Sequence, residues 1–402
     1  MTGERTSLDR ISHFVHDHFL WLLLATYAVA AAVPGLGLAI RDVSAGRVGL
    51  AGESMNLSLP ALMLGFLLLN AGLGVKASEL RDLARRPSLL GLGLAANLLI
   101  PIAFIFVVSR AMRGWHSADE VQLILVGLGL VASMPIAGSS TAWSQNADGD
   151  LALSLGLVVG STLLSPFATP MALHAVGFMA KGDYAEDLHE LASHGSGVFL
   201  MACVVAPSLL GIAIRLLVGE PRLAAARPYL KLANSANLLV LSYSNASAAL
   251  PQAIRNPDWD FLGAIMAITS ALCVLAFASG WAIARRVGAS PATRASLMYG
   301  LGMNNNGTGL VLASMALADH PRVMLPIIVY NLVQQVVAGI VGHIEGRRIG
   351  RSEGHSGLRG HAIRSGEARG PLSVTGGSAR HSSQERPLRH ETGRRADGLD
   401  RP

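Results

Sequence analysis

The chain has 402 residues, of which 51% are hydrophobic and only 14% are charged, with a net charge of +6 and a mean hydropathy of +0.44. A soluble protein carries charged side chains at about a quarter of its positions, so this composition excludes an ordinary soluble globular protein. Apolar runs of about 20 residues, separated by short charged loops, predict a polytopic membrane protein instead.

The chain begins with a polar segment, residues 1–19, and no small-residue cleavage pattern follows it, so we expect no cleavable signal peptide. Residues 20–344 form the predicted membrane domain. Its ten predicted spans are Leu20–Ile40, Leu59–Val75, Ser88–Ser109, Val121–Trp143, Asp150–Val176, Gly197–Val218, Tyr229–Leu250, Phe261–Ile283, Met298–Leu317 and Arg322–His343. The predicted fold class is an all-α polytopic membrane protein with ten transmembrane helices.

The charges of the loops predict how the chain is oriented. If the N-terminus lies inside, the cytoplasmic loops carry more Lys and Arg than the outer loops, as the positive-inside rule requires. An even number of spans then places the C-terminus inside as well. We therefore expect a multi-pass protein of the plasma (inner) membrane, in contact with lipid, with both termini cytoplasmic.

Residues 345–402 are rich in Arg, Gly, Ser and His and lack apolar periodicity. This composition predicts a disordered basic tail that lies on an anionic lipid leaflet, and we expect no nucleic-acid partner. The two cysteines, Cys203 and Cys273, lie in separate apolar runs, which predicts buried packing rather than a disulfide or a metal site.

Two of the ten spans contain helix breakers and small polar residues near their middle. The fourth span reads Ser-Met-Pro-Ile-Ala-Gly-Ser-Ser-Thr over 133–141, and the ninth reads Gly-Met-Asn-Asn-Asn-Gly-Thr-Gly over 302–309. Each is the fourth member of a set of five spans, and an odd number of spans per set would invert the second set. The pattern predicts two inverted five-helix repeats with helices 4 and 9 discontinuous, as in secondary transporters.

Both interruptions suit a binding site, although each also has a simpler interpretation. Pro135 has no amide hydrogen and would leave carbonyls near Val131 free, while the following hydroxyls and the asparagines add oxygen atoms. The alternative for the fourth span is a kink whose hydroxyls bond to the preceding turn. The alternative for the asparagines, and for Asn97 in the third span, is hydrogen bonding between helices without a ligand.

Several residue types are missing from the predicted spans. No Asp or Glu lies in the middle of a span, which disfavours proton coupling through a membrane carboxylate. The chain has no Walker-type loop and no His-Glu-x-x-His sequence, and His174 has no evident partner. We therefore expect neither ATP-driven transport by this chain alone nor an enzyme.

The order of these segments resembles the bile acid:sodium symporter family over about Leu59–Gly342. The resemblance rests on Asn-Leu-Leu-Ile-Pro at 97–101, on the fourth-span break and the segment continuing to Ser154, and on Gly-Met-Asn-Asn at 302–305. It implies a ten-span inverted-repeat fold in which spans one, two, six and seven move against a core. It also implies that a sodium ion binds where the interrupted spans cross.

The resemblance places sodium ligands at specific positions of this chain. The candidate metal ligands are Ser140, Thr141, Ser154, Asn97, Asn304 and, through its backbone carbonyl, Met303. The acidic ligand of the family falls on Gly300, and one of its hydroxyl ligands falls on Val158, so coupling to two sodium ions is not implied. The candidate substrate-binding residues are Asn305, Asn306, Asn245 and Thr308.

We therefore expect a secondary active transporter of small organic anions, bile-acid-like or other carboxylates or sulfonates. It would work by alternating access, with sodium coupling of altered stoichiometry and without a required protein partner. One alternative is a sodium-independent organic-anion carrier or exporter. Another, from a different class, is a membrane sensor that does not transport.

Overall fold

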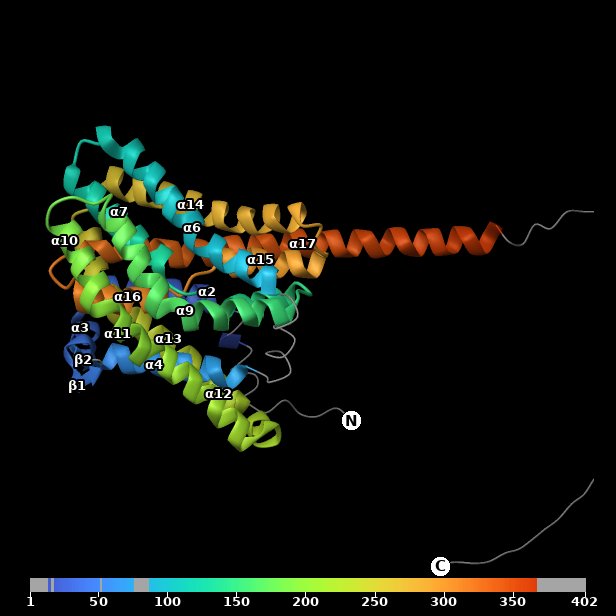
Figure 1. The fold of residues 1–402 in the computed structure, drawn as a ribbon, viewed down its shortest axis with the longest axis horizontal. Coiled ribbons are helices and arrows are strands. Elements are labelled where there is room, and N and C mark those ends of the chain that lie inside the picture. The colour runs from blue at the N-terminus through green and yellow to red at the C-terminus, as the bar shows by residue number, and fades with distance from the viewer. Residues whose placement is uncertain (1–13, 16–17, 51–52, 76–86, 367–402) are drawn as a thin grey trace, which may run out of the picture. The chain divides into compact units, whose positions relative to one another are not determined.

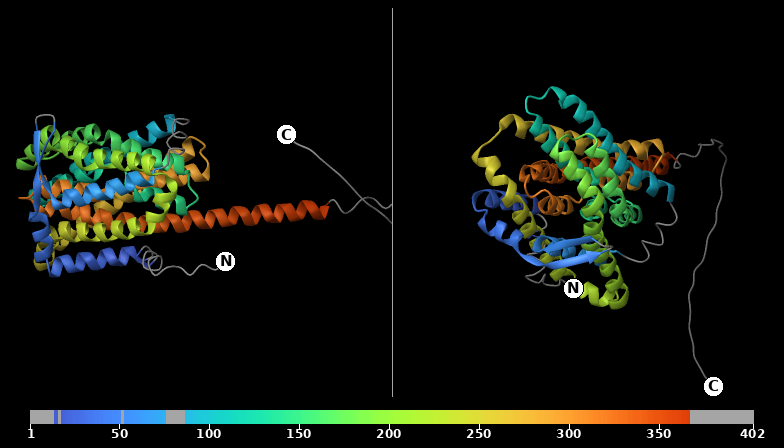
Figure 2. Two further views of the ribbon diagram at one scale, coloured as in Figure 1. Left: turned by 90° about the horizontal axis from the view of Figure 1, so that it is seen from below. Right: turned by 60° about the vertical axis from the view of Figure 1, so that its left-hand side comes forward.

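The computed structural model describes residues 14–15, 18–50, 53–75 and 87–366, and the statements below refer to these residues. Contacts divide the chain into one compact unit at residues 1–349 and a second at 350–402. The first unit is a bundle of helices (Figures 1 and 2). Of the second unit, the structure describes only the end of helix α17 (Met324–Gly366). The remainder of the predicted tail, residues 367–402, lies outside the described residues.

The first predicted span is not one straight helix. Helix α2 (Phe19–Ala32) and helix α3 (Gly35–Asp42) replace the predicted Leu20–Ile40 and are bent by 91° at the break between them. The bend occurs at Pro34, which cannot donate a backbone hydrogen bond to the preceding turn and disfavours the helical conformation at Val33.

Two short strands correct the all-α prediction. Strand β1 (Ser44–Leu50) pairs antiparallel with strand β2 (Glu53–Ser58), with Val48 opposite Met55. The register shifts between Ser44 and Arg47, where Gly46 has a φ of +123° that suits a bulge in the strand. These strands are short and rich in small residues, so their alternation is a weak signal in the sequence.

The remaining helices follow in chain order. They are α4 (Leu59–Gly74), α6 (Pro87–Ala111), α7 (Ala118–Ser133), α8 (Ser139–Asn146), α9 (Leu151–Gly177), α10 (Asp183–Glu190), α11 (Ser196–Leu200), α12 (Ala206–Val218), α13 (Glu220–Arg255), α14 (Trp259–Arg286), α15 (Pro291–Gly302), α16 (Asn306–Ala316) and α17. The N-termini of α4, α7, α9, α14 and α15 are capped by side chains that accept a backbone N–H, from Ser58, Ser117, Asp150, Asp258 and Ser290 respectively.

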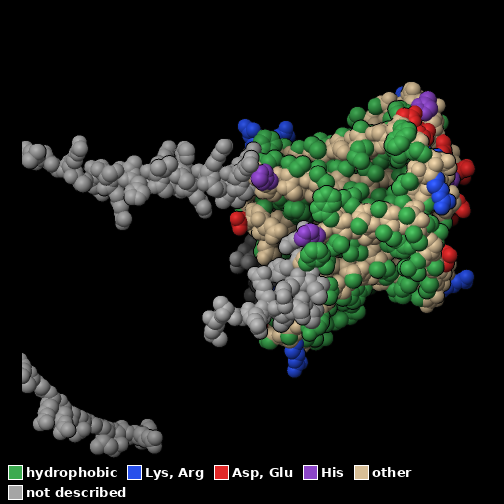
Figure 3. All heavy atoms as spheres, turned by 180° about the vertical axis from the view of Figure 1, so that it is seen from behind, with side chains coloured by type: hydrophobic (Ala, Val, Ile, Leu, Met, Phe, Trp, Pro, Cys, Tyr) green, Lys and Arg blue, Asp and Glu red, His purple; other side chains and the backbone are tan. Residues whose placement is uncertain are grey.

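Five described helical segments are long and apolar enough to cross a membrane. They are Pro87–Gly114, Leu151–Gly177, Asp183–Val218, Trp259–Arg286 and Pro321–Glu345, and the bent pair α2–α3 would be a sixth. On the face drawn in Figure 3, hydrophobic side chains cover the middle, and charged side chains gather at the two ends. This distribution is that of a polytopic membrane protein, while the count of ten spans and the inverted repeats stay predictions.

The helices contact one another in two groups. In the α13 group, α13 packs on α2, α3 and α4, and α4 packs on α12. In the α9 group, helices α6, α7, α8, α9, α14 and α15 pack mainly on each other. Helix α16 contacts α4 and α13 of the first group and α7 of the second. The α13 group includes helices of predicted spans one, two, six and seven, which the family resemblance expects to move together.

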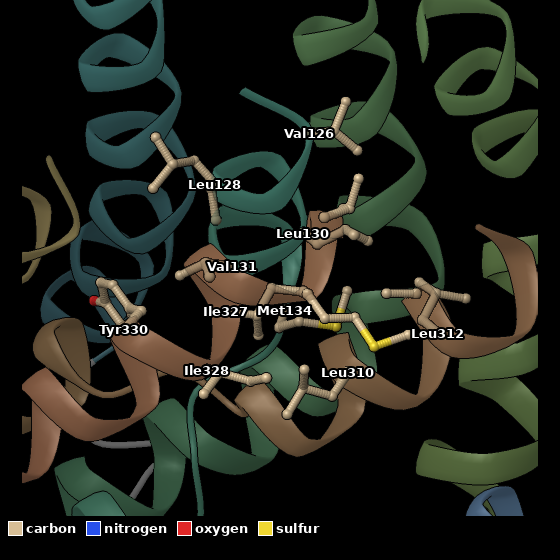
Figure 4. Close-up of a cluster of buried hydrophobic side chains, with 14 of the residues drawn as sticks. Val126, Leu128, Leu130, Val131, Met134, Leu310, Leu312, Ile327, Ile328 and Tyr330 are labelled. Carbon is tan, nitrogen blue, oxygen red and sulfur yellow. The ribbon is translucent and has the colours of Figure 1, made fainter. Parts of the chain in front are cut away.

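The centre of the bundle is filled by aliphatic side chains of α7, α16 and α17 (Figure 4). Leu130, Val131, Leu310, Ile327 and Ile328 are each at most 2% exposed. Lipid chains are as apolar as these side chains, so the stabilisation comes from close packing rather than from removal of water.

The two predicted interruptions are both present, and they pair with each other. Between α7 and α8, the amide of Ala137 donates to the carbonyl of Met303 at 2.9 Å. Between α15 and α16, the amide of Asn305 donates to the carbonyl of Pro135 at 2.9 Å, and Ile136 faces Asn304 as an antiparallel bridge. The backbone groups that the broken helices release therefore satisfy one another where the two segments cross.

Side chains from α9, from α17 and from the break between α15 and α16 complete this crossing. Asn304 Nδ2 donates to the carbonyl of Val131 at 3.0 Å, in the region where Pro135 was expected to free a carbonyl. Gln334 Oε1 on α17 accepts the amide of Asn304 at 3.2 Å. Ser161 Oγ on α9 accepts the amide of Ile136 at 3.0 Å. We conclude that the crossing is held by hydrogen bonds to its backbone from both sides.

The packing of α14 on α15 makes a first prediction. A Cβ at Gly280 would lie 2.5 Å from the Leu297 carbonyl oxygen and 2.7 Å from Met298 Cα, whereas one at Gly263 on the same helix meets no atom within 4 Å. Gly280→Ala should lower the free energy of unfolding by about 1–3 kcal/mol, and Gly263→Ala should raise it by about 0.5–1 kcal/mol. Thermal unfolding in detergent measures both, and equal stability of the two variants would contradict this packing.

The crossing makes a second prediction. Gln334→Leu removes the acceptor of the buried Asn304 amide, which should lower the free energy of unfolding by about 1–3 kcal/mol. Gln335→Leu is the matched control, and we expect an effect of at most about 0.5 kcal/mol. Thermal unfolding of the purified variants compares the two. If Gln335→Leu destabilised the protein as much as Gln334→Leu, the bond to Asn304 would not be what supports the crossing.

Candidate functional site

The crossing lies beside the short helix α8, whose first turn carries Ser140 and Thr141. Ser154, in the first turn of α9, donates from its Oγ to Thr141 Oγ1 at 3.3 Å. Helix α8 packs on both α9 and α15. The structure thus brings together the three hydroxyl residues that the sequence predicted as metal ligands.

Three of the predicted metal ligands have a buried side-chain oxygen without a hydrogen-bond partner. These oxygens are Ser140 Oγ, Asn97 Oδ1 and Asn304 Oδ1, in residues that are 0%, 8% and 2% exposed. A buried oxygen without a donor costs about 1–3 kcal/mol, so a partner is expected. Hard cations such as sodium prefer oxygen ligands, and the donor set here fits a small cation held by neutral oxygens.

Asn97 approaches this region on α6, which packs on α9 and α15. Its neighbour Ala96 belongs to a small buried cluster with Leu157 and Leu301. Met303 lies at the crossing itself, where its carbonyl already accepts the amide of Ala137. A carbonyl oxygen has two lone pairs, so the role of Met303 as a ligand stays a prediction.

The structure shows what surrounds Gly300, the position where the resemblance to the bile acid:sodium symporters places an acidic ligand. A Cβ at Gly300 would lie 2.8 Å from Leu157 Cδ1, and Leu157 is 0% exposed. The space beside Gly300 is therefore filled by an aliphatic side chain. The carbonyl of Val158, at the position of a family hydroxyl ligand, accepts from Ser161 Oγ at 3.0 Å. The residues around Gly300 do not fit a second cation site.

Carboxylate and imidazole clusters do not offer another metal site. Within the part of the chain that the structure describes, no group of three or more His, Cys, Asp or Glu side chains could hold a metal ion. Cys203 and Cys273 are buried free thiols, as the sequence predicted. His174, which the sequence left without a partner, has its Nδ1 2.8 Å from His189 Nδ1 on α10.

A second set of unpartnered polar side chains lies on α4, α13 and α16, three helices that contact one another in pairs. We call Asn70, Asn245, Asn306 and Thr308 the amide seam. Both side-chain polar atoms of each asparagine, and Oγ1 of Thr308, are buried without a hydrogen-bond partner. Three of these residues were predicted as substrate-binding. Asn70 was missed, since a single amide within an apolar run does not reveal which helix it faces.

Several contacts locate the seam next to the crossing. Ala71, which follows Asn70, lies 3.8 Å from the position of a Cβ on Gly138 in the break between α7 and α8. On α13, the Tyr243 hydroxyl donates to the Val33 carbonyl at 2.5 Å. The face of α13 that carries Tyr243 is therefore turned toward α2 and α3. Asn245 is about 200° further around the helix and so faces away from them. Helix α16, which carries Asn306 and Thr308, contacts both α4 and α13, the helices of Asn70 and Asn245.

Asn305 has a structural role that the sequence did not assign. Its Oδ1 accepts the amide of Thr308 at 3.2 Å and caps the N-terminus of α16. The next residue, Asn306, begins the helix and is 1% exposed. Of the asparagine triplet, Asn304 therefore supports the crossing, Asn305 caps a helix and Asn306 joins the seam, because three consecutive residues point in different directions.

Comparison with known proteins identifies the family of this fold. Residues 17–344 match the SBF-like CPA transporter family. The chain is also 25% identical over 257 residues to the uncharacterized protein YbaS of Bacillus subtilis (strain 168), covering 62% of this chain and 79% of the relative. The family supports the predicted class of membrane transporter, while membership of the bile acid:sodium symporter family proper stays a prediction. The chain therefore belongs to the SBF-like CPA transporter family.

Proposed function

We propose that the protein is a secondary active transporter of small organic anions, coupled to one sodium ion and working by alternating access in the inner membrane. The observation that carries this proposal is the crossing of two broken helices with unpartnered buried oxygens beside it. Secondary transporters bind substrates and coupling ions at such interruptions. Ser140, Asn97 and Asn304 would hold the cation, with Thr141 and Ser154 alongside.

The charge distribution supports an anionic substrate. Helices α4 and α16, and residues 237–250 of α13, carry no Lys, Arg, His, Asp or Glu. The N-termini of α8 and α16 both begin at the crossing, and a helix N-terminus carries a partial positive charge. A carboxylate near these ends would be stabilised, and the sodium ion would balance its charge.

The grouping of the helices supports alternating access. The α13 group and the α9 group have separate internal contacts, and the amide seam lies where the α13 group meets α16. Asn245 and Asn306 are 0% and 1% exposed, so the seam is closed in this conformation. A movement of the α13 group away from α16 would open the seam to one side of the membrane.

One observation favours a second candidate, a sodium-independent carrier or exporter of organic anions. Leu157 fills the space beside Gly300, so the carboxylate that would bind sodium most strongly is replaced by packing. If neutral oxygens are too weak to bind sodium, the same alternating movement would carry the anion alone.

Uptake into proteoliposomes separates these functions. The purified protein would be given an inward sodium gradient, with potassium and choline gradients as controls. The labelled carboxylates would be cholate, lactate, propionate, malate and succinate. We expect sodium-stimulated uptake of at least one of them, with a hyperbolic dependence on sodium because the proposal has one cation site. Uptake indifferent to sodium would support the carrier, and uptake no greater than in empty vesicles would refute transport of organic anions.

Two serines of helix α8 test the cation site. Ser140 and Ser144 are both 0% exposed, but Ser144 Oγ lies 2.7 Å from Ser296 Oγ, whereas Ser140 Oγ has no partner. Ser140→Ala should raise the half-saturating sodium concentration about tenfold, since it removes a ligand, without loss of thermal stability. Ser144→Ala should lower the thermal stability and leave the sodium dependence unchanged. If sodium dependence changed equally in both, Ser140 would not be a specific ligand.

A further inference from the structure

In each asparagine of the amide seam, both the nitrogen and the oxygen of the side-chain amide lack a hydrogen-bond partner. Nδ2 and Oδ1 of Asn70, Asn245 and Asn306 are all buried, and none has a hydrogen-bond partner. Each amide can donate two hydrogen bonds from nitrogen and accept two at oxygen. Leaving such atoms unpaired in an apolar interior is unfavourable, so a bound molecule or water is expected to satisfy both kinds of atom when the seam opens.

An asparagine of the same helix shows the contrast. Asn237 on α13 donates from its Nδ2 to the Met63 carbonyl on α4 at 2.7 Å. That bond is how an amide holds two helices together. Asn245 lies two turns further along α13 and makes no comparable bond. The seam asparagines therefore do not form hydrogen bonds between helices in this conformation.

The balance of donors and acceptors restricts the ligand. A plain carboxylate accepts hydrogen bonds only, so it would pair with the amide nitrogens and leave the oxygens Oδ1 unsatisfied. A metal cation would bind the amide oxygens and leave the amide nitrogens without acceptors. Water satisfies both, but a ligand that displaces water without replacing its hydrogen bonds loses affinity. A steroid carboxylate would place mostly apolar atoms against the amides.

We infer that the substrate is a small hydroxylated carboxylate, whose hydroxyl group donates to an amide oxygen of the seam while its oxygens accept from the amide nitrogens. This inference rests on the proposed function and names the substrate class of the same transporter. Asn70, Asn245, Asn306 and Thr308 together supply both donors and acceptors from three helices. The seam thus selects against carboxylates that lack a hydroxyl group.

Matched pairs of carboxylates test the substrate class. The thermal stability of the full-length protein in detergent would be measured with lactate against propionate, malate against succinate, and gluconate against hexanoate. We expect at least one hydroxylated acid to stabilise the protein at a concentration about tenfold lower than its partner, since one hydrogen bond distinguishes them. Equal stabilisation within every pair, stabilisation only by cholate, or no stabilisation by any hydroxylated acid would overturn the inference.

Substitutions in the seam test the residues. Asn245→Leu and Asn306→Leu replace unpartnered amides with apolar groups of similar size, so the melting temperature without ligand should stay the same or rise by about 2 °C, and stabilisation by the hydroxylated acid should be lost. Asn245→Ala and Asn306→Ala control for overpacking by Leu. Asn237→Leu breaks a formed bond and should lower the melting temperature without abolishing stabilisation by the acid. If the melting temperature fell as much in all the seam variants as in Asn237→Leu, the seam amides would be structural.

Different results would contradict the substrate class and the transport function. Uptake of organic anions without a preference for the hydroxylated member of a pair would leave the proposed transport intact and overturn the substrate class. Stabilisation by hydroxylated acids that depends on Asn245 and Asn306, together with no anion uptake, would support the binding site and overturn the transport.

Discussion

The structure depends on one constraint, that backbone groups released inside an apolar bundle must find partners. Pro135 follows the end of α7, the Gly-Met-Asn-Asn segment ends α15, and both breaks are buried in the bundle. The two interruptions solve the problem jointly, because Ala137 and Asn305 each donate to the carbonyl of the opposite segment. Each break therefore supplies an acceptor for a backbone amide of the other.

The same constraint explains the distribution of polar side chains around the crossing. Gln334 Oε1, Ser161 Oγ and Asn304 Nδ2 bond to backbone groups, whereas Asn304 Oδ1 has no partner. Ser140 and Asn97 are not used in this way and keep unpartnered oxygens. Polar atoms that form no hydrogen bond within the protein are the ones that can bind a ligand. The division between supporting and binding side chains therefore follows from counting hydrogen bonds rather than from residue type.

The pair Gly300 and Leu157 shows how the site differs from that of the bile acid:sodium symporters. Where that family carries a carboxylate, this chain has no side chain, and Leu157 from α9 occupies the space. An aliphatic side chain thus lies where the resemblance places a buried charge, so this position carries neither the desolvation cost of a carboxylate nor its attraction for a cation. What remains are neutral oxygens, and the amide seam adds neutral donors and acceptors from the α13 group and α16.

The sequence by itself determined that the protein is helical and membrane-embedded, and it located the two interruptions, because apolar runs and helix breakers are local properties of the chain. It also drew attention to Asn304, which the structure places in the crossing, while the roles of Ser140, Thr141 and Ser154 stay predictions. It did not reveal the bend at Pro34 within the first span, the β1–β2 strands or the place of Asn70 in the seam. Only the tertiary structure decided which of the three adjacent asparagines supports the crossing, caps α16 or stays unpartnered. The physical reason is that a hydrogen bond between residues about 170 positions apart, such as Asn304 with Val131, depends on how helices pack and leaves no mark in the local sequence.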